Sequence, residues 1–292
     1  MSDAPEVDAP EVDARDVSDA GDAAATEIAE APPRLETGWE PDTPIGDTLI
    51  RQFVVGYAQW MEAVARASGG PVLRTDDFVA VDDHAAHPLL NHTIVLRPLS
   101  PDRADAVVAA LCGFYTGAGG PFSMFCPWPT SFLGLQVEGY PPLMLRPPGG
   151  DRPPPPPGLE ITAAGSREQL GDYERVLIDG FPLEAMQPFR AGAVFHPANL
   201  HVPGTQFFVG RAEGQPVTVA TSIVACGVNH VEFVATLPDA RGRGYGEAVT
   251  WAATLAAPEL PAVLVASDMG RPVYERMGYV ALTRWMFLIG SR

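Results

Sequence analysis

At residues 231–253 the sequence reads VEFVATLPDARGRGYGEAVTWAA, in which an apolar, strand-like run passes through a glycine-rich turn into a helix-like run. The turn contains Gly242, Gly244 and Gly246. Glycines leave backbone N–H groups accessible at the start of a helix, where such groups form a nest for phosphate oxygens. The pattern therefore predicts a pyrophosphate-binding turn between a strand and a helix.

Two other kinds of phosphate loop do not fit this turn. A Walker A loop needs Gly-Lys-Ser/Thr, and the sequence contains none. The dinucleotide fingerprint G-x-G-x-x-G fails because Glu247 stands where its third glycine would be. The turn thus argues against a nucleoside triphosphate or a dinucleotide as the ligand.

The elements around the turn predict an α/β fold with a mixed α+β sheet. An antiparallel hairpin precedes the turn, and a helix followed by a further strand comes after it, which is the pattern of a layered sheet with helices. Ser166 is a suitable N-cap for the first helix of this region. The predicted strands are 159–164, 205–214, 216–227, 230–237, 262–267 and 280–289, and the predicted helices are 166–180, 244–256 and 271–276.

A second motif, YERMGY at residues 274–279, lies downstream of the turn. The turn RGRGYG resembles the acetyl-CoA signature Q/R-x-x-G-x-G/A of the GNAT superfamily, and YERMGY resembles its second element, a tyrosine four residues before Gly-Phe or Gly-Tyr. The resemblance covers most of residues 159–289. It implies a GNAT-type acyltransferase fold and an N-acetyltransferase that moves an acetyl group directly from acetyl-CoA to an amine.

The resemblance also implies a set of coenzyme contacts. The strand before the turn would pair its backbone with the pantetheine arm. The turn would bind the pyrophosphate through main-chain N–H groups, with the side chains of Arg241 and Arg243 adding positive charge at its rim. The implied coenzyme residues are Val234, Ala235, Thr236, Arg241, Gly242, Arg243, Gly244, Tyr245, Gly246 and Ser267.

The second motif and the strand before the turn supply the candidate catalytic residues. By resemblance, Tyr274 is the acid that protonates the departing thiolate. Strand alternation places His230, Glu232, Val234 and Thr236 on one face, and the first two are titratable groups near the expected thioester, so each is a candidate base. We prefer Glu232. The alternatives are that these are ordinary strand and core residues and that water alone receives the proton.

Residues 46–146 predict a smaller α/β domain. An apolar stripe over residues 50–64 indicates a core-facing helix. The predicted strands are 76–81, 92–99, 122–126 and 139–146, with a helix at 100–114. Residues 92–114 resemble residues 159–181, which suggests a duplicated, degenerate GNAT-like half without a coenzyme turn. Its expected role is to pack against the catalytic domain and supply apolar walls to an acceptor pocket from Phe122, Phe125, Trp128 and Tyr140. The alternative is a purely structural domain.

Composition sets the remaining boundaries and excludes several classes. Residues 1–45 are acidic and poor in aromatics, which predicts a disordered tail, and the proline-rich run 147–158 predicts a linker before the catalytic domain 159–292. The net charge of −17 argues against nucleic acid as a partner. No signal or membrane-length apolar run is seen, so we expect a cytoplasmic protein without membrane contact.

The cysteines and histidines predict no metal site, because none stand at ligand spacing. The acceptor is expected to be a small-molecule or protein amine, and the oligomeric state stays open between monomer and homodimer. A function of another class is also consistent with these motifs, namely a non-catalytic acyl-CoA-binding sensor or regulatory module.

Overall fold

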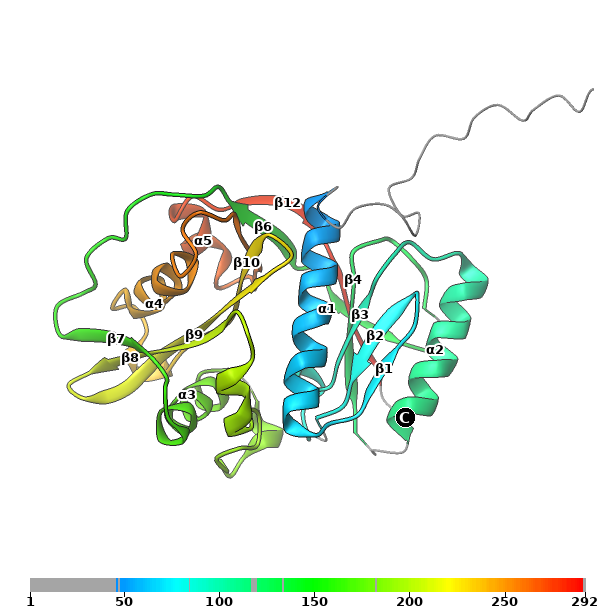
Figure 1. The fold of residues 1–292 in the computed structure, drawn as a ribbon, viewed down its shortest axis with the longest axis horizontal. Helices are drawn as coiled ribbons and strands as arrows, with labels where there is room; N and C mark the ends of the chain where they lie inside the picture. The colour runs from blue at the N-terminus through cyan, green and yellow to red at the C-terminus, as the bar shows by residue number, and fades with distance from the viewer. Residues whose placement is uncertain are drawn as a thin grey trace, which may run out of the picture. The chain divides into compact units, whose positions relative to one another are not determined.

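Two sheets organise the described part of the chain. The computed structural model describes residues 46, 48–83, 85–116, 120–132, 134–181 and 183–290, so the predicted tail 1–45 lies outside the described residues. Within that part the strands form a six-stranded sheet, called sheet A, and a seven-stranded sheet, called sheet B (Figure 1).

Sheet B has the order β12-β6-β11-β10-β9-β8-β7. All of its neighbours are antiparallel except β10 and β11, which are parallel and are joined through helix α4. A parallel pair requires such a crossover because its strands enter from the same end. The bounds are β6 (Pro142–Arg146), β7 (Leu159–Ala163), β8 (Thr205–Ala212), β9 (Gln215–Ala225), β10 (Val228–Thr236), α4 (Tyr245–Thr254), β11 (Ala262–Val265) and β12 (Val280–Arg284).

Sheet A has the order β1-β2-β3-β4-β13-β5 and contains a second unit of the same kind, because β3 and β4 are parallel and joined through α2. The counterpart of β3–α2–β4 is thus β10–α4–β11. Strand β7, in residues 159–181, pairs antiparallel with the next strand, β8, whereas β3, in residues 92–114, pairs parallel with the next strand, β4. The predicted match between these two segments is therefore wrong. The bounds are β1 (Val72–Arg74), β2 (Phe78–Val81), β3 (His92–Val95), α2 (Pro101–Thr116), β4 (Phe122–Cys126), β5 (Gln136–Gly139) and β13 (Met286–Gly290).

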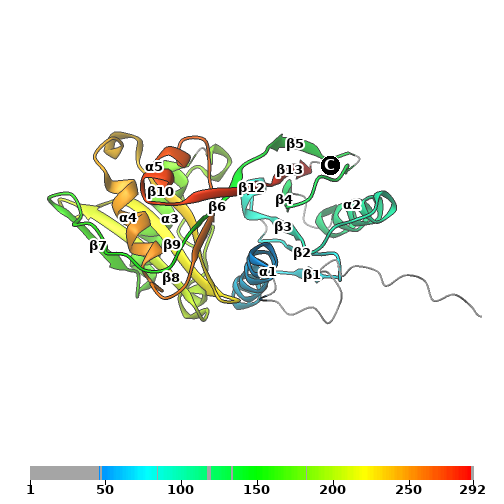
Figure 2. The same ribbon diagram turned by 90° about the horizontal axis from the view of Figure 1, so that it is seen from above.

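The two halves of the chain exchange strands. Strand β6, from the amino-terminal half, lies between β11 and β12 in sheet B, and the last strand, β13, lies between β4 and β5 in sheet A (Figure 2). The predicted single strand 280–289 is therefore two strands that belong to different sheets, with Trp285 between them. Strand pairing crosses the predicted linker at 147–158 in both directions.

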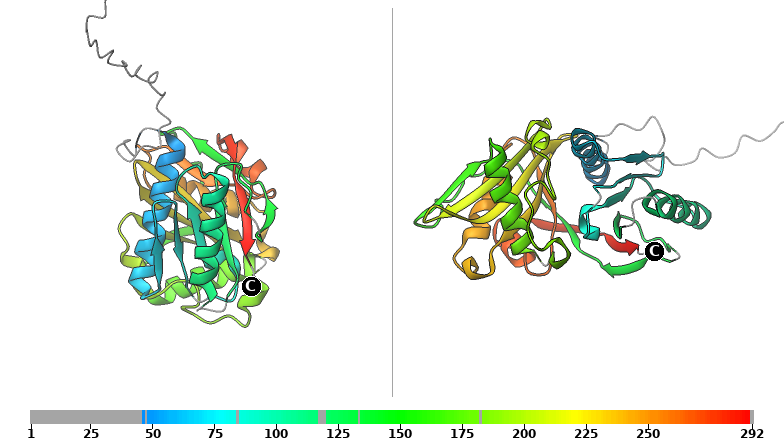
Figure 3. Two further views of the ribbon diagram at one scale, coloured as in Figure 1. Left: turned by 90° about the vertical axis from the view of Figure 1, so that its right-hand side faces the viewer. Right: turned by 90° about the horizontal axis from the view of Figure 1, so that it is seen from below.

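Helices cover both faces of each sheet. Helix α1 (Leu49–Ser68) contacts strands of sheet A and sheet B, and it buries the predicted stripe from Phe53 to Val64 against both. In sheet A, α2 packs on the face opposite α1 (Figure 3). In sheet B, α3 (Arg167–Gly180) packs on the α1 side, and α4 and α5 (Arg271–Arg276) pack on the other.

Local signals account for where these helices begin and end. The Ser166 side chain accepts a hydrogen bond from the Gln169 backbone N–H, which confirms it as the N-cap of α3.

Among the described helices, none is long and apolar enough to cross a membrane. The short 3₁₀ segments are η2 (Pro88–Leu90), η3 (Glu184–Met186), η4 (Pro197–His201) and η5 (Pro238–Ala240).

Strand β10 carries a β-bulge that changes which side chains share a face. Glu232 pairs with Thr221 and Ala235 with Val219, so two residues of β10 lie opposite one residue of β9. Phe233, in the bulge, has φ 53°. Ala235 therefore follows Glu232 on the α1 and α3 face. The predicted alternation is wrong beyond Glu232, since Val234 packs in the core cluster of α4 and α5, and Thr236 lies against Gly246, at the start of α4.

Candidate active site

Strands β10 and β11 form a fork. They pair at Asn229 with Ala262 and at His230 with Val263, and beyond this no described strand pairs with that edge of β10. Asn229 fixes the closed end, because its side-chain amide donates to the carbonyls of Ala253 and Thr254 at the end of α4. The open edge is free to pair with an extended ligand, as a sheet edge pairs with an added strand.

The glycine-rich turn lies between the end of β10 and the start of α4. Gly242 has φ 74° and Gly244 has φ 77°, a region that favours glycine. Gly244 is the N-cap of α4, and no side chain caps this helix. A Cβ atom at Gly244 would lie 3.3 Å from Cγ of Pro156, in the proline-rich run, and one at Gly246 would lie 3.0 Å from Oγ1 of Thr236. The turn is a tight cradle whose backbone can approach a phosphate group.

The two arginines of the turn differ in their surroundings. Arg241 donates from Nη2 to the Gly180 carbonyl at 2.8 Å and from Nε to the Thr236 carbonyl at 3.2 Å. Its guanidinium thus links the turn to the end of α3, which is a structural role that the sequence did not predict. Arg243 is exposed beside the predicted phosphate site.

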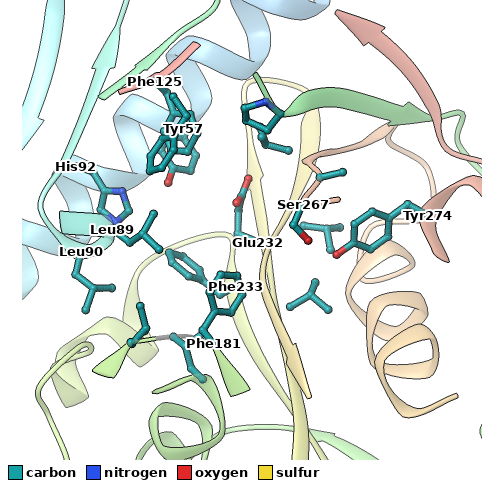
Figure 4. Close-up of a pocket in the computed structure, with 18 residues that line it drawn as sticks. Tyr57, Leu89, Leu90, His92, Phe125, Phe181, Glu232, Phe233, Ser267 and Tyr274 are labelled. Carbon is teal, nitrogen blue, oxygen red and sulfur yellow. The ribbon is translucent and has the colours of Figure 1, made fainter. Parts of the chain in front are cut away.

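A cavity of about 210 Å³ lies at the open side of the fork. Residues of both halves of the chain line it, from α1, η2, β3 and β4 as well as from α3, β10 and α5. Figure 4 shows Glu232 between the rings of Tyr57, above it, and Phe233, below it. Ser267 and Tyr274 lie to the right of Glu232 in this view. The cavity therefore brings Glu232, Ser267 and Tyr274 together, as the sequence predicts.

Glu232 is the acidic group of this cavity. Its side chain is partly accessible, but Oε1 is buried and has no hydrogen-bond partner among the described residues. Burial raises the pKa of the Glu232 carboxyl to about 8, because a charge is poorly solvated there. A buried carboxyl that lacks a partner is costly for the fold, and such groups are often retained for function.

Two histidines lie near Glu232, and only one faces the cavity. His230 is fully buried against α1, with its ring 4.7 Å from the Phe53 ring, and it does not line the cavity. His92, which the sequence did not predict as a site residue, does line it. Burial lowers the pKa of His230 to about 3 and that of His92 to about 4. Both are therefore weak bases, and Glu232 is the stronger candidate.

Ser267 follows the carboxyl end of β11, and Tyr274 lies in α5. Burial, followed by the neighbouring Tyr279 and Glu232, raises the pKa of Tyr274, so its hydroxyl stays protonated. The Ser267 hydroxyl accepts a hydrogen bond from the Gly270 N–H at 3.1 Å.

Within the described residues, no group of three or more His, Cys, Asp or Glu is placed to hold a metal ion.

The amino-terminal half supplies walls different from most of those predicted. Of the four predicted aromatic residues, Phe125 lines the cavity. Phe122 packs in the core with α2, Trp128 packs against the core clusters on both faces of sheet A without lining the cavity, and Tyr140 is 55% exposed. Sequence reasoning missed Tyr57 and Leu89. Tyr57 belongs to the apolar stripe of α1, and nothing in that stripe separates a cavity residue from a core residue.

The raised pKa of Glu232 predicts a pH-dependent stability. Between about pH 4.5 and pH 8 the folded protein holds a proton that the unfolded chain releases, so this carboxyl costs stability as the pH rises through that window. The Glu232→Gln variant does not bear this cost. We expect its advantage in free energy of unfolding over wild type to grow by on the order of 2–4 kcal/mol from pH 5 to pH 9.

Urea denaturation at the two pH values measures this difference. The control is Glu160→Gln, at an exposed position of β7, which should change the free energy of unfolding by less than about 0.5 kcal/mol. An advantage of Glu232→Gln that is the same at both pH values would show that the carboxyl is not held protonated.

Comparison with known proteins identifies the fold. No family model and no curated protein sequence matches the chain. Among solved structures, it is similar to a GCN5-related N-acetyltransferase from Kribbella flavida, with 20% identity, a TM-score of 0.59, and coverage of 82% of this chain and 95% of that chain. A protein from Novosphingobium aromaticivorans assigned to the GNAT family gives 21% identity, a TM-score of 0.50, and coverage of 79% and 97%.

A conserved protein of unknown function from Staphylococcus epidermidis gives 16% identity, a TM-score of 0.53, and coverage of 76% and 94%. The covered shares exceed the length of residues 159–292, so the likeness extends into the amino-terminal half. At these identities the likeness concerns the fold. The chain has the fold of the GCN5-related N-acetyltransferases.

Proposed function

We propose that this protein is an acetyl-CoA-dependent N-acetyltransferase whose amine acceptor binds in the cavity at the open side of the β10–β11 fork. The observation that carries the proposal is the Glu232 carboxyl, which faces this cavity with a buried Oε1 that has no hydrogen-bond partner among the described residues. The GNAT fold supports the reaction class, since its similar structures include an N-acetyltransferase.

The residues at the fork and turn fit acetyl-CoA as the acyl donor. The turn from Arg241 to Gly246 offers an uncapped helix start to the pyrophosphate, and the open edge of β10 from Val234 to Thr236 offers backbone groups to the pantetheine arm. Bound in this way, acetyl-CoA supplies a thioester at the mouth of the cavity. Ser267 and Tyr274 line the cavity at the β11 side of the fork.

The cavity residues account for the transfer step. Glu232 accepts a proton from the amine as the amine nitrogen forms its bond to the acetyl carbon. The bond from that carbon to sulfur breaks, and Tyr274 donates a proton to the departing sulfur. Exchange with solvent then returns Glu232 and Tyr274 to their starting states. The products are an amide and free coenzyme A.

The pKa of Glu232 suits this role. A general base works best when its pKa lies near the working pH, and burial brings this carboxyl to about 8. An amine that enters protonated would also be attracted to the ionised carboxylate.

Binding of acetyl-CoA should depend on the glycine turn. Gly244→Glu places a bulky, negative side chain in the cradle beside Pro156. At a hundredfold excess of acetyl-CoA over Kd, the wild-type melting temperature should rise by roughly 5–10 °C, because a ligand that binds only the native state stabilises it. The variant should show no such rise.

The matched control is Gly214→Glu in the β8–β9 turn. Gly214 has φ 77°, as Gly244 does, and a Cβ atom there would meet no neighbour within 4 Å. Both variants thus bear the same backbone strain, and only Gly244→Glu changes the proposed site. The proposal is contradicted if wild type shows no shift or if Gly244→Glu retains the full shift.

A further inference from the structure

The walls of the cavity are aromatic and aliphatic. The ring of Phe125 lies 6.5 Å from that of Tyr57 and 5.0 Å from that of Phe287, and all three line the cavity. Phe233 and Phe181 line it as well, and Figure 4 shows them on the other side of Glu232 from Tyr57 and Phe125. A group that enters the cavity is therefore held between rings, which favour apolar and aromatic partners.

The volume of the cavity limits the size of its occupant. A cavity of about 150 Å³ in another protein holds benzene. The cavity here measures about 210 Å³. It can accommodate one aromatic ring, or a branched aliphatic group of similar size, together with a short arm.

The charges of the cavity limit the chemistry of its occupant. Glu232 is the one acidic side chain of the lining, and the lining residues, all within the described part of the chain, include no arginine or lysine. A carboxylate on the acceptor would be buried without a cationic partner, and a second ammonium group would be buried without a second acid. Burying either charge without a partner would cost a large amount of binding free energy in an apolar site.

We infer that the acceptor is a small primary monoamine without a carboxylate, whose body is a single aromatic ring or a branched aliphatic group on a short arm. The amine nitrogen lies at Glu232, and the body lies between Tyr57, Phe125 and Phe233. This inference rests on the proposed acetyl transfer and specifies its substrate class. It also excludes polyamines and basic amino acids, although the chain has a net charge of −17.

A panel of four amines tests the inference with the full-length protein and saturating acetyl-CoA. The panel contains 2-phenylethylamine, isopentylamine, phenylalanine and spermidine, and release of the coenzyme A thiol gives the rate. We expect kcat/KM for the first two to exceed that for the last two by at least about 100-fold, the scale on which a buried site rejects an unpaired polar group. Phenylalanine or spermidine equal to or better than 2-phenylethylamine would overturn the inference.

The panel separates failure of the acceptor class from failure of the proposed function. If phenylalanine or spermidine is the preferred acceptor, acetyl transfer stands and the acceptor class is wrong. If acetyl-CoA raises the melting temperature while all four amines remain unmodified, the acceptor class is contradicted, and acetyl transfer is contradicted as well when a wider pool of primary amines also remains unmodified.

A variant adds a second test that does not depend on the amount of folded protein. Phe125→Ala lengthens the cavity, so the ratio of kcat/KM for tryptamine to that for 2-phenylethylamine should rise at least about tenfold, as expected when the size of an apolar pocket changes. The matched control is Phe114→Ala in α2, which packs in the core of sheet A away from the cavity and should leave the ratio unchanged. An unchanged ratio in Phe125→Ala would overturn the placement of the amine body.

Discussion

Glu232→Gln is expected to lower kcat for acetyl transfer by about 10²–10⁴-fold, the usual contribution of a general base. Glutamine keeps the shape of the side chain but cannot accept the proton of the amine. Affinity for acetyl-CoA should stay within about threefold of wild type, because the coenzyme turn and the fork are unchanged. Initial rates at saturating amine, together with a binding titration of acetyl-CoA, measure the two effects separately.

The pH profile gives the same substitution an independent readout. Below the pKa of about 8 the wild-type carboxyl is mostly protonated and cannot act as a base, so kcat/KM calculated on the concentration of neutral amine should rise with pH and level off above that value. The variant should lack this limb, and the exposed Glu160→Gln control should retain it. A variant whose rate lies within tenfold of wild type would remove Glu232 from the role of base.

Trp285→Ala is expected to lower the free energy of unfolding by about 3–5 kcal/mol, the range for loss of a large buried aromatic side chain. Trp285 is fully buried between β12 of sheet B and β13 of sheet A, and its ring lies 4.6 Å from that of Phe53 in α1. Its backbone N–H donates to the Pro141 carbonyl just before β6. The residue therefore supports both exchanged strands at once.

Urea denaturation of the full-length chain measures this loss. Leu282→Ala is the matched control, since Leu282 is 49% exposed on the adjacent edge strand β12 and its removal leaves no core cavity. The control should cost less than about 1 kcal/mol. A loss at Trp285 no greater than that of the control would show that the junction between the sheets contributes little to stability.

Local chemistry made part of this structure predictable. The turn at Gly242 and Gly244 needs positive φ values that glycine adopts freely, and the helix of α3 begins at a serine that caps it. The apolar stripe of α1 has the helical period and is buried as expected. In each case a few adjacent residues determine the backbone, so the sequence alone identifies the element.

Long-range pairing and the β-bulge were not predictable in the same way. The sequences PLMLR of β6 and MFLIG of β13 are both short apolar strands, and nothing in their periodicity says which sheet each one joins. Phe233 adopts a positive φ without being glycine, so the bulge leaves no mark in the sequence. The single extra residue moved Val234 and Thr236 away from the face of Glu232.

The cavity itself depends on these long-range features. Glu232, Ser267 and Tyr274 come from the half with recognisable motifs, and they meet as predicted. Tyr57 and Phe125 reach the same cavity because α1 packs on both sheets and because the chain passes from β12 in sheet B directly into β13, which pairs with β4 in sheet A. The amino-terminal half thus shapes the acceptor side of the site although it has no coenzyme turn of its own.

The most direct test of acetyl transfer is product formation by the full-length wild-type protein. The protein is incubated at about pH 8.5 with acetyl-CoA and 2-phenylethylamine, and the amide and free coenzyme A are quantified by mass spectrometry and thiol titration. We predict that the two products appear in equal amounts over many turnovers. Saturable binding of acetyl-CoA without amide formation, for this amine and for a wider pool of primary amines, would contradict the account and identify a coenzyme-binding sensor instead.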